Sequence, residues 1–475
     1  MKVAGLDIGT TGCKLTVFDR EGNYVDSAYR DYPLKRTGSL REINISAMTE
    51  GVFAVLNELT AKYGDIKSIG VTSFGEAFVM TDAEGRPLND AMIYTDPRGR
   101  EECGQLVDAL GADVIPGITG LAPHEMYSIA KIMWIKNNRP ETYAKAKHIF
   151  LIADYVVFCL TGRAQIDYSL ATRTMAFDII NLKWSEAVFR AAGVDIPLMS
   201  EPVPPGTVAG KWKGIDIVSV AHDQVAAACG AGVFDGNTAV DGAGTVQCLT
   251  PVYDSLPDIP VMSKNRFCVV PYIIPGKYAA YAFSYTGGAL IKWCLDCFGK
   301  GQTNESLEKC YKGDGPTGLL VLPHFAGAAT PYMDTGSKGA IVGLTTATTA
   351  SDIYKACMEG VCYEMRLNYD RLRTTGVHFT GINATGGGAK SRIWMQMKAD
   401  VLDLPITALE TSEAGTVGCA MIAGIAAGIF KDINEAAAHM VRRTVTYYPQ
   451  EAMHERYMEI YDRYKDLYRA VRPLV

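Results

Sequence analysis

The sequence predicts two α/β domains, each with a largely parallel sheet covered by helices on both faces. At 475 residues the chain exceeds the roughly 250 to 300 residues at which a single hydrophobic core stops growing. Short strand patterns alternate with helical ones, which is typical of parallel sheets. A glycine-rich strand–turn–strand pattern also occurs once in each half, which indicates a duplicated domain.

The first half begins with a predicted hairpin and continues into an α/β alternation. We predict strands at residues 3–9, 14–19 and 24–32, because these runs are bounded by glycine-containing turns. Residues 46–63 predict a helix, since apolar residues recur there at helical spacing. Residues 66–72 are a further apolar run, which we predict as the next strand.

The second half repeats this opening. Residues 237–252 have the form of a strand, a small-residue turn and a second strand. We therefore place the domain boundary near residues 233–237, with an N-terminal domain of residues 1–235 and a C-terminal domain of residues 236–475. The stretch 202–214 is rich in Pro and Gly and is predicted as a loop within the first domain.

Composition argues against two classes of protein. The chain has 46 Lys and Arg against 52 Asp and Glu, a formal net charge of −6 without long runs of one sign, so we predict no nucleic-acid partner. The apolar run at residues 419–429 is shorter than the roughly 20 residues that span a bilayer, so we predict a buried helix and no membrane partner. The first residues lack a basic leader and the 12 cysteines are scattered, which favours reduced thiols in the cytoplasm.

The turn Gly9-Thr10-Thr11-Gly12 directly follows the predicted strand that carries Asp7. Glycine lets backbone N–H groups approach an anion closely, and threonine hydroxyls add donors. The same residues also suit a plain hairpin, so this turn alone leaves both interpretations open. It lacks the GxxxxGK[ST] spacing of a Walker A loop.

Two further turns in the second half have a similar composition. Gly244 and Thr245 lie in a small-residue turn, and two facing turns of this kind can hold the phosphates of a nucleotide. Residues 385–391 follow a predicted strand and precede a predicted helix, where flat glycine backbone and a helix N-terminus suit a nucleotide. A tight strand-to-helix turn without a ligand is the alternative.

Two longer motifs resemble the signatures of one family, the FGGY carbohydrate kinases. Residues 126–135 have the spaced Ser, Lys and Trp of the first signature, and residues 339–359 are similar to the second, with departures at Cys357 and Met358. The motifs follow the family's order from residue 5 to about residue 430. The resemblance implies the ribonuclease H-like fold of actin and hexokinase for both domains, with ATP bound in a cleft between them.

The resemblance assigns ATP and Mg²⁺ to specific residues. Asp7 resembles the family's aspartate near Mg²⁺, and Asp223 is a second metal candidate. The residues that match the family's nucleotide positions are Gly9, Thr10, Thr11, Lys14, Gly244, Thr245, Gly288, Gly387, Gly388 and Ala389. We expect Mg²⁺ to arrive with ATP, held through water and carboxylate.

His222-Asp223-Gln224 resembles the family's base motif, which makes Asp223 the predicted catalytic residue. Phosphoryl transfer needs positioning, charge stabilisation and one group that accepts the proton of the attacking hydroxyl. The alternative is an aspartate that caps the following helix, and the two roles can coexist.

The predicted substrate-binding residues are Gly75, Glu76, Asp96, Arg98 and Asp223. Gly75 and Glu76 occupy the place of the family's first substrate motif without matching its Met-His-Gly or Arg-Glu forms. Asp96 and Arg98 resemble the family's WxDxR motif, with Tyr94 in place of Trp. A carboxylate at Glu76 accepts hydrogen bonds from neighbouring hydroxyls and repels an acidic substrate, unless an arginine compensates. A surface glutamate without substrate contact is the alternative.

Together these residues predict an ATP-dependent kinase that phosphorylates a primary hydroxyl of a small sugar. Overall resemblance favours a ketose such as D-xylulose, and the alternatives within the class are another pentulose, a polyol or an aldonate. An actin-like or chaperone-like ATPase is the alternative from another class, although a polar sugar site with Glu76, Asp96 and Asp223 has no use there. The partners we expect are a small sugar or polyol and a second copy of the chain in a homodimer.

Overall fold

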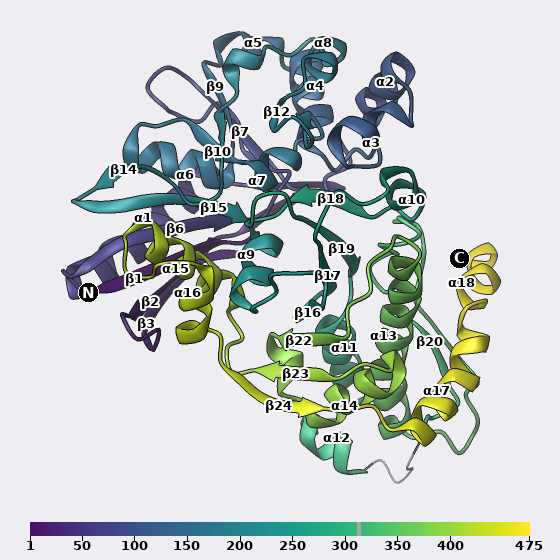
Figure 1. Ribbon diagram of the computed structural model, residues 1–475. Coiled ribbons are helices and arrows are strands. Elements are labelled where there is room, and N and C mark those ends of the chain that lie inside the picture. The colour runs from purple at the N-terminus through teal and green to yellow at the C-terminus, as the bar shows by residue number, and fades with distance from the viewer. Residues whose placement is uncertain (311–314) are drawn as a thin grey trace. The chain divides into compact units, whose positions relative to one another are not determined.

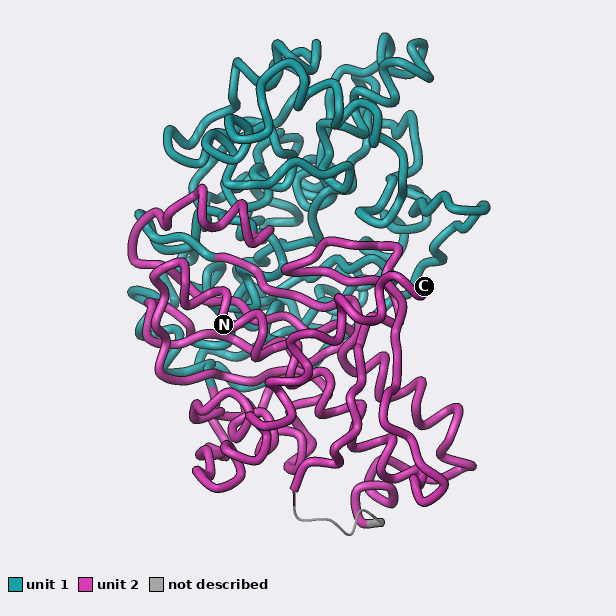
Figure 2. Tube along the Cα trace, turned by 90° about the vertical axis from the view of Figure 1, so that its right-hand side faces the viewer, with its two compact units in different colours: residues 1–232, 268–279, 414–441 teal, residues 233–267, 280–413, 442–475 magenta. Residues whose placement is uncertain are grey.

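The computed structural model describes residues 1–310 and 315–475, and Figure 1 shows its helices and strands. The chain divides into two compact units, each made of segments that lie far apart in the sequence (Figure 2). Unit 1 comprises residues 1–232, 268–279 and 414–441, and unit 2 comprises residues 233–267, 280–413 and 442–475. The predicted domains, residues 1–235 and 236–475, are continuous and therefore differ from these units, because residues 268–279 and 414–441 belong to unit 1.

A six-stranded sheet forms the centre of unit 1, in the order β14-β15-β6-β1-β2-β3. Its strands are β1 (Lys2–Ile8), β2 (Gly12–Asp19), β3 (Tyr24–Asp31), β6 (Ile66–Ser73), β14 (Thr207–Trp212) and β15 (Ile215–His222). Strands β1, β6 and β15 run parallel to one another, and the outer strands are antiparallel to their neighbours. The predicted strands of the first half are therefore confirmed, with slightly shifted ends.

Helix α1 (Ile45–Lys62) confirms the predicted first helix and packs against β2 and β3. Its cap residue Asn44 accepts a hydrogen bond from the Ala47 N–H at 2.9 Å. This bond satisfies a donor that the first helical turn leaves without an intrahelical partner. A local sequence signal therefore fixes where the helix begins.

Helix α15 (Ala414–Ala426) lies against β1 and β6, although it comes from the far end of the sequence. Glycines make the approach close. A Cβ on Gly5 would lie 2.0 Å from the Thr416 carbonyl oxygen, and one on Gly70 would lie 2.3 Å from the Cys419 carbonyl oxygen. A larger residue at either position would force the helix away from the sheet, because protein interiors are close-packed.

Unit 1 also contains smaller sheets, further helices and one 3₁₀ turn. They are β4 (Leu34–Thr37), β5 (Leu40–Ile43), β7 (Phe78–Thr81), β8 (Ala91–Met92), α2 (Arg100–Leu110), α3 (Val114–Thr119), α4 (Ser128–Asn138), α5 (Pro140–Lys145), β9 (His148–Leu151), α6 (Ile152–Thr161), β10 (Gln165–Asp167), α7 (Tyr168–Thr172), β11 (Phe177–Asp178), β12 (Lys183–Trp184), α8 (Glu186–Ala192), a 3₁₀ turn (Ile196–Leu198), β13 (Glu201–Val203), α9 (Asp223–Gly230), β18 (Cys268–Pro271) and α16 (Ile433–Met440). The prediction of a loop at residues 202–214 is wrong in part, because β14 forms there. Gly210 lies at a register shift of this edge strand, where glycine is tolerated.

Unit 2 repeats the topology of unit 1, which confirms the predicted duplication. Its strands follow the order β17-β16-β22-β23-β24, with β16, β22 and β23 parallel and the outer two antiparallel to their neighbours. This order corresponds to β2-β1-β6-β15-β14 of unit 1, so β16 is the counterpart of β1. The bounds are β16 (Thr238–Ala243), β17 (Gln247–Tyr253), β22 (Gly381–Thr385), β23 (Ile406–Leu409) and β24 (Arg443–Tyr447), and β19 (Tyr278–Ser284) begins in unit 1.

The helices of unit 2 include α13 (Ala350–Arg373), which begins with a capping box between Thr349 and Asp352. The other elements are α10 (Ile259–Lys264), α11 (Gly288–Phe298), α12 (Asn304–Cys310), β20 (Leu320–Leu322), β21 (Ala340–Val342), a 3₁₀ turn (Gly387–Lys390), α14 (Arg392–Leu402), α17 (Glu451–Tyr464), α18 (Leu467–Val471) and a 3₁₀ turn (Arg472–Leu474). Among the described residues, no helix is both long and apolar enough to cross a membrane.

Candidate active site

Three carboxylates lie at one edge of the unit 1 sheet. Strands β1, β6 and β15 are parallel neighbours whose last residues are aligned in register. Asp7 lies at this end of β1, Glu76 follows β6, and Asp223 follows β15 directly. The carboxyl ends of parallel strands commonly form ligand sites. The structure thus brings together three residues that the sequence predicts as functional.

Asp223 is the first residue of helix α9, and its side chain is 27% exposed. His222, not Asp223, occupies the cap position of this helix. Asp223 Oδ1 has no hydrogen bond to any described residue, although His222 Nε2 lies 3.2 Å from it. Burial raises the pKa of Asp223 to about 8, and the charges of Asp7 and Glu76 add to this effect. A carboxyl group with a pKa near neutrality suits proton transfer.

Glu76 is buried and forms an ion pair with Arg173, a residue that no sequence motif marks. The Arg173 Nε donates to Glu76 Oε1 at 2.6 Å, and the Arg173 Nη2 donates to the same oxygen. The guanidinium also lies over the Tyr127 ring, 5.2 Å from its centroid. The alternative of a surface Glu76 is therefore wrong, and a compensating arginine is present. The two partners are 97 residues apart in the chain, so no local pattern links them.

The backbone at Gly75 leaves no room for a larger residue. A Cβ there would lie 2.8 Å from Arg173 Cγ and 3.1 Å from His222 Cδ2. The next residue, Glu76, has a left-handed φ of 67°, which costs energy for any residue other than glycine. Such strain is typical of functional sites, where the surrounding structure holds it in place.

Tyr94 lies near two of the three carboxylates. Burial raises the pKa of its phenol, and the charges of Glu76 and Asp223 raise it further. The phenol is therefore protonated at neutral pH and can donate a hydrogen bond. Because Tyr94 occupies the Trp position of the WxDxR motif, this departure from the family pattern adds a polar group beside the carboxylates.

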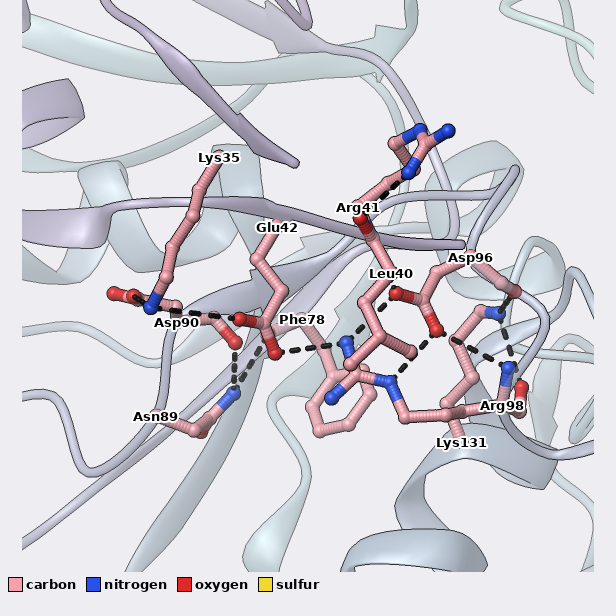
Figure 3. Close-up of polar contacts among 10 residues, drawn as sticks. All are labelled: Lys35, Leu40, Arg41, Glu42, Phe78, Asn89, Asp90, Asp96, Arg98 and Lys131. Carbon is pink, nitrogen blue, oxygen red and sulfur yellow. Dashed lines mark hydrogen bonds and ion pairs between the residues drawn. The ribbon is translucent and has the colours of Figure 1, made fainter. Parts of the chain in front are cut away.

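Asp96 and Arg98 form an ion-pair cluster with Glu42 (Figure 3). Arg98 donates from Nε to Asp96 Oδ1 and from Nη2 to Asp96 Oδ2, each at 2.7 Å, and Nη2 lies 2.7 Å from Glu42 Oε1. The Arg41 N–H donates to Asp96 Oδ2 at 2.7 Å. Protein donors therefore engage both oxygens of Asp96, which favours a role in holding its loop. Contact of Asp96 or Arg98 with a substrate stays a prediction.

Lys131 on α4 holds the loop that carries this cluster. Its Nζ donates to the Asp96 carbonyl at 2.6 Å and to the Arg98 carbonyl at 3.2 Å. Burial lowers the pKa of Lys131 to about 8. Lys131 is the Lys of the first signature motif, so the structure gives that motif a physical role in fixing the loop.

The turn after β1 closes through a bond from the Gly9 N–H to the Gly12 carbonyl at 2.9 Å. Lys14 is the register partner of Asp7, so both side chains project from the same face of the sheet. Asp7 also lies beside the N-terminus of α15, since a Cβ on Gly415 would be 3.0 Å from Asp7 Oδ2. Helix N-termini stabilise anions, which favours an ionised Asp7.

Three segments that contain glycine pack against one another in unit 2. The Gly288 N–H donates to the Gly244 carbonyl at 2.9 Å, and the Gly287 N–H donates to the Thr245 carbonyl at 2.9 Å. A Cβ on Gly386 would lie 2.7 Å from the Ala243 carbonyl oxygen. The predicted nucleotide residues of unit 2 therefore belong to one backbone assembly; these residues are Gly244, Thr245, Gly288, Gly387, Gly388 and Ala389. A Cβ on Gly387 would meet nothing within 4 Å, so open space adjoins this assembly.

Within residues 1–310 and 315–475, no group of three or more His, Cys, Asp or Glu side chains is placed to hold a metal ion. A magnesium ion at Asp7 would need water and phosphate oxygens as its other ligands, which is how Mg²⁺ is commonly bound. A cavity of about 500 Å³ lies in unit 2 between α12, α13, α14 and α17. Its lining residues include none of the predicted nucleotide residues.

The chain matches the models of both domains of one protein family. Residues 2–230 match the N-terminal domain of the FGGY family of carbohydrate kinases, and residues 250–427 match its C-terminal domain. Together the two matches cover most of the chain.

Individual relatives match the chain over nearly its full length. A xylulose kinase of Staphylococcus epidermidis is 25% identical over 99% of this chain and 97% of its own length. A glycerol kinase of Enterococcus faecalis is 29% identical over 92% of this chain and 91% of its own length. The solved structures of a xylulose kinase and a gluconate kinase from Lactobacillus acidophilus superpose with TM-scores of 0.91 and 0.90. Each is 22% identical and covers 99% of this chain and 98% of its own, so the two share its fold.

Proposed function

We propose, from the premise that the chain belongs to the FGGY family of carbohydrate kinases, that it phosphorylates a primary hydroxyl of a neutral ketose or polyol. Membership makes the chain a sugar phosphotransferase that uses ATP, which decides against the assembly or chaperone ATPase. The proposal adds the acceptor class, the general base and the role of each carboxylate.

The observation that carries the proposal is the environment of Asp223. Its pKa is raised to about 8 at the strand edge that also holds Asp7 and Glu76. Its Oδ1 is buried and has no hydrogen bond to a described residue, and we infer that the hydroxyl of a bound acceptor supplies the missing partner. We therefore assign Asp223 as the general base and Asp7 as the carboxylate nearest to the metal.

Each unit, taken by itself, has turns whose backbone donors suit the phosphates of a nucleotide. Bound ATP supplies the phosphoryl group, and Mg²⁺ bound with it offsets the charge of the phosphates. Asp7 would lie beside the metal and Lys14 beside the phosphates, and the turn at residues 9–12 would add N–H donors. In unit 2, the turns at Gly244 and Gly387 offer further backbone donors, and glycine at their contacts leaves the backbone uncovered.

The acceptor class follows from the charges beside Asp223. Glu76 and Arg173 neutralise each other, so the charge that disfavours an acidic acceptor beside Asp223 is that of Asp7. The Glu76–Arg173 pair offers donors and acceptors to neighbouring hydroxyls. We favour a ketose such as D-xylulose, because the relatives named xylulose kinase match nearly the whole chain. A small polyol is the second candidate, because Arg173 brings a guanidinium to Glu76 as in the Arg-Glu form of the family's motif.

ADP formation with a panel of pentuloses, polyols and aldonates tests this proposal. A ketose should give the highest kcat/KM, a polyol should follow, and ADP should not form without an acceptor. Sugar-independent ADP release, or an aldonate as the best substrate, would contradict the assignment.

A further inference from the structure

A buried ion pair joins strand β16 to helix α14 in unit 2. Lys398 Nζ lies 2.6 Å from Asp241 Oδ2, and neither side chain is exposed. Gln247 completes the cluster, because its Oε1 accepts from Lys398 at 3.1 Å and its Nε2 donates to Asp241 Oδ1. The partners lie on three different elements, and no sequence motif marks Lys398 or Gln247.

This cluster holds both ends of the turn that contains Gly244 and Thr245. Asp241 precedes the turn on β16, and Gln247 follows it as the first residue of β17. The carbonyls of Gly244 and Thr245 accept bonds from the start of α11, so they are also fixed from outside the turn. The conformation of the turn therefore depends on the bonds that Lys398 makes.

The same helix supports the glycine turn before α14. Lys398 lies one helical turn after Trp394, with its Nζ 4.7 Å from the centre of that ring. A Cβ on Gly388 would lie 3.0 Å from Trp394 Cζ3 and 3.0 Å from Ala243 Cβ. Two of the three segments predicted to bind the nucleotide in unit 2 thus contact the Lys398 cluster or the helix that carries it.

Stability alone does not account for this pair. A buried ion pair is often no more stabilising than apolar residues of the same volume. Charge explains the presence of Lys398 better, because an unpaired Asp241 carboxylate beside this turn would repel the phosphates of a nucleotide. In unit 1 the corresponding strand carries Asp7, whose charge acts on Asp223, whereas Lys398 cancels the charge of Asp241.

We propose that Lys398 is a positioning residue for ATP, which holds the turn at Gly244 and Thr245 and cancels the charge of Asp241 so that the turn accepts phosphates. The inference rests on the proposed ATP site in unit 2. It goes beyond that site because it assigns a positioning role to Lys398, a residue that touches no substrate.

Binding of ATP to the full chain without sugar, measured by calorimetry, tests the inference with three variants. Lys398→Met leaves the Asp241 charge unpaired, so ATP affinity should fall by about tenfold or more. Asp241→Asn leaves a positive charge, so affinity should equal or exceed that of the wild type. The variant with both substitutions carries neither charge and should lie between the two.

A purely structural role for the pair predicts that the two single variants weaken ATP binding equally. That result, or wild-type affinity in folded Lys398→Met, would overturn the inference. Lys355→Met is the matched control, since it removes another buried lysine of unit 2, whose Nζ donates to the Gly315 carbonyl at 2.6 Å, and it should leave ATP affinity unchanged. In Lys398→Met the sugar KM should change by less than about twofold, which separates positioning of ATP from general damage.

Two further outcomes keep the test decisive. If Lys398→Met does not fold, the test compares the ATP affinity of Asp241→Asn with that of the double variant. Weaker ATP binding by Asp241→Asn than by the double variant would overturn the inference. ATP binding is measured without sugar, so a wrong acceptor assignment leaves the binding result intact and affects only the comparison of sugar KM values. Wild-type protein that binds no ATP would overturn both the inference and the proposed function.

Discussion

The Cβ and Cγ of Arg173 lie against Gly75, and its guanidinium donates two hydrogen bonds to a single oxygen of Glu76. Glu76 is therefore half of a neutral pair and not a free acid. Its left-handed backbone and the missing side chain at Gly75 are both conditions for this pair. The first prediction tests that dependence.

Gly75→Ala should weaken sugar binding and leave ATP binding unchanged. The new Cβ would press on Arg173 and His222 and displace the guanidinium from Glu76. We expect a loss of about 1–3 kcal/mol in the free energy of unfolding, and a sugar KM raised by about tenfold. Thermal unfolding and steady-state kinetics measure the two effects. Gly104→Ala in α2 is the control, because a Cβ there meets nothing within 4 Å, and an unchanged sugar KM in Gly75→Ala would refute the argument.

Asp223→Asn should lower kcat by about 10² to 10⁴, the usual contribution of a general base, while the protein stays folded. The amide keeps the size of the side chain but cannot accept the proton of the hydroxyl. ATP affinity should stay close to that of the wild type, as measured by calorimetry. Near-normal turnover in the folded variant would remove Asp223 from the mechanism.

Turnover should rise with pH through about 8, because Asp223 acts as a base only when it is ionised. Glu76→Gln removes one of the negative charges that raise this pKa, so the inflection of kcat/KM should move to lower pH. The measurement is a pH–rate profile for both proteins with the same sugar. An inflection that stays in place or moves upward would contradict the proximity of Glu76 and Asp223.

The same pKa makes the wild type less stable as pH rises. The folded pKa of Asp223 is about 8 and its ordinary value is 3.8, so the unfolded chain releases the proton first and stability falls between these two values. Asp223→Asn removes this loss and should stabilise the protein at pH 8 by about a few kcal/mol. Calorimetric unfolding should show a larger gain in Tm at pH 8 than at pH 5, and equal gains would argue against the raised pKa.

Asp96→Asn should destabilise the protein by about 3–5 kcal/mol, the cost of breaking a buried ion pair. Burial acts to raise the pKa of Asp96, but the bonds from Arg98 and Arg41 hold it below its usual value. The wild type should therefore lose stability as the pH falls below the ordinary aspartate range. Urea unfolding measures both effects. Asp90→Asn is the control in the same region, because its ion pair with Lys35 spans 3.8 Å and is partly exposed.

A variant Asp96→Asn with normal stability and a raised sugar KM would give the opposite answer. It would mean that Asp96 contacts the substrate and that the cluster in Figure 3 contributes little to folding.

Local patterns explain which parts of this molecule could be predicted from the sequence. The hairpin at each domain start has strands and a glycine turn within a few residues, so its duplication was visible without a structure. Asp7 and Asp223 lie next to strand ends, where a motif and its strand coincide. Lys398 and Arg173 could not be found in this way, because their partners lie 157 and 97 residues away and leave no spacing signal. The prediction of a loop at residues 202–214 was wrong in part because Pro and Gly also occur in edge strands.

Helix α15 has a consequence for protein synthesis. Gly5 and Gly70 carry no side chains, so without α15 the backbone of β1 and β6 is uncovered on this face. Domains generally fold as they emerge from the ribosome, but this face stays open until residues 414–426 have been translated. The core of unit 1 is therefore incomplete until this helix has been synthesised. For the same reason, residues 1–235 expressed alone should aggregate, and co-expression of residues 236–475 should restore soluble protein.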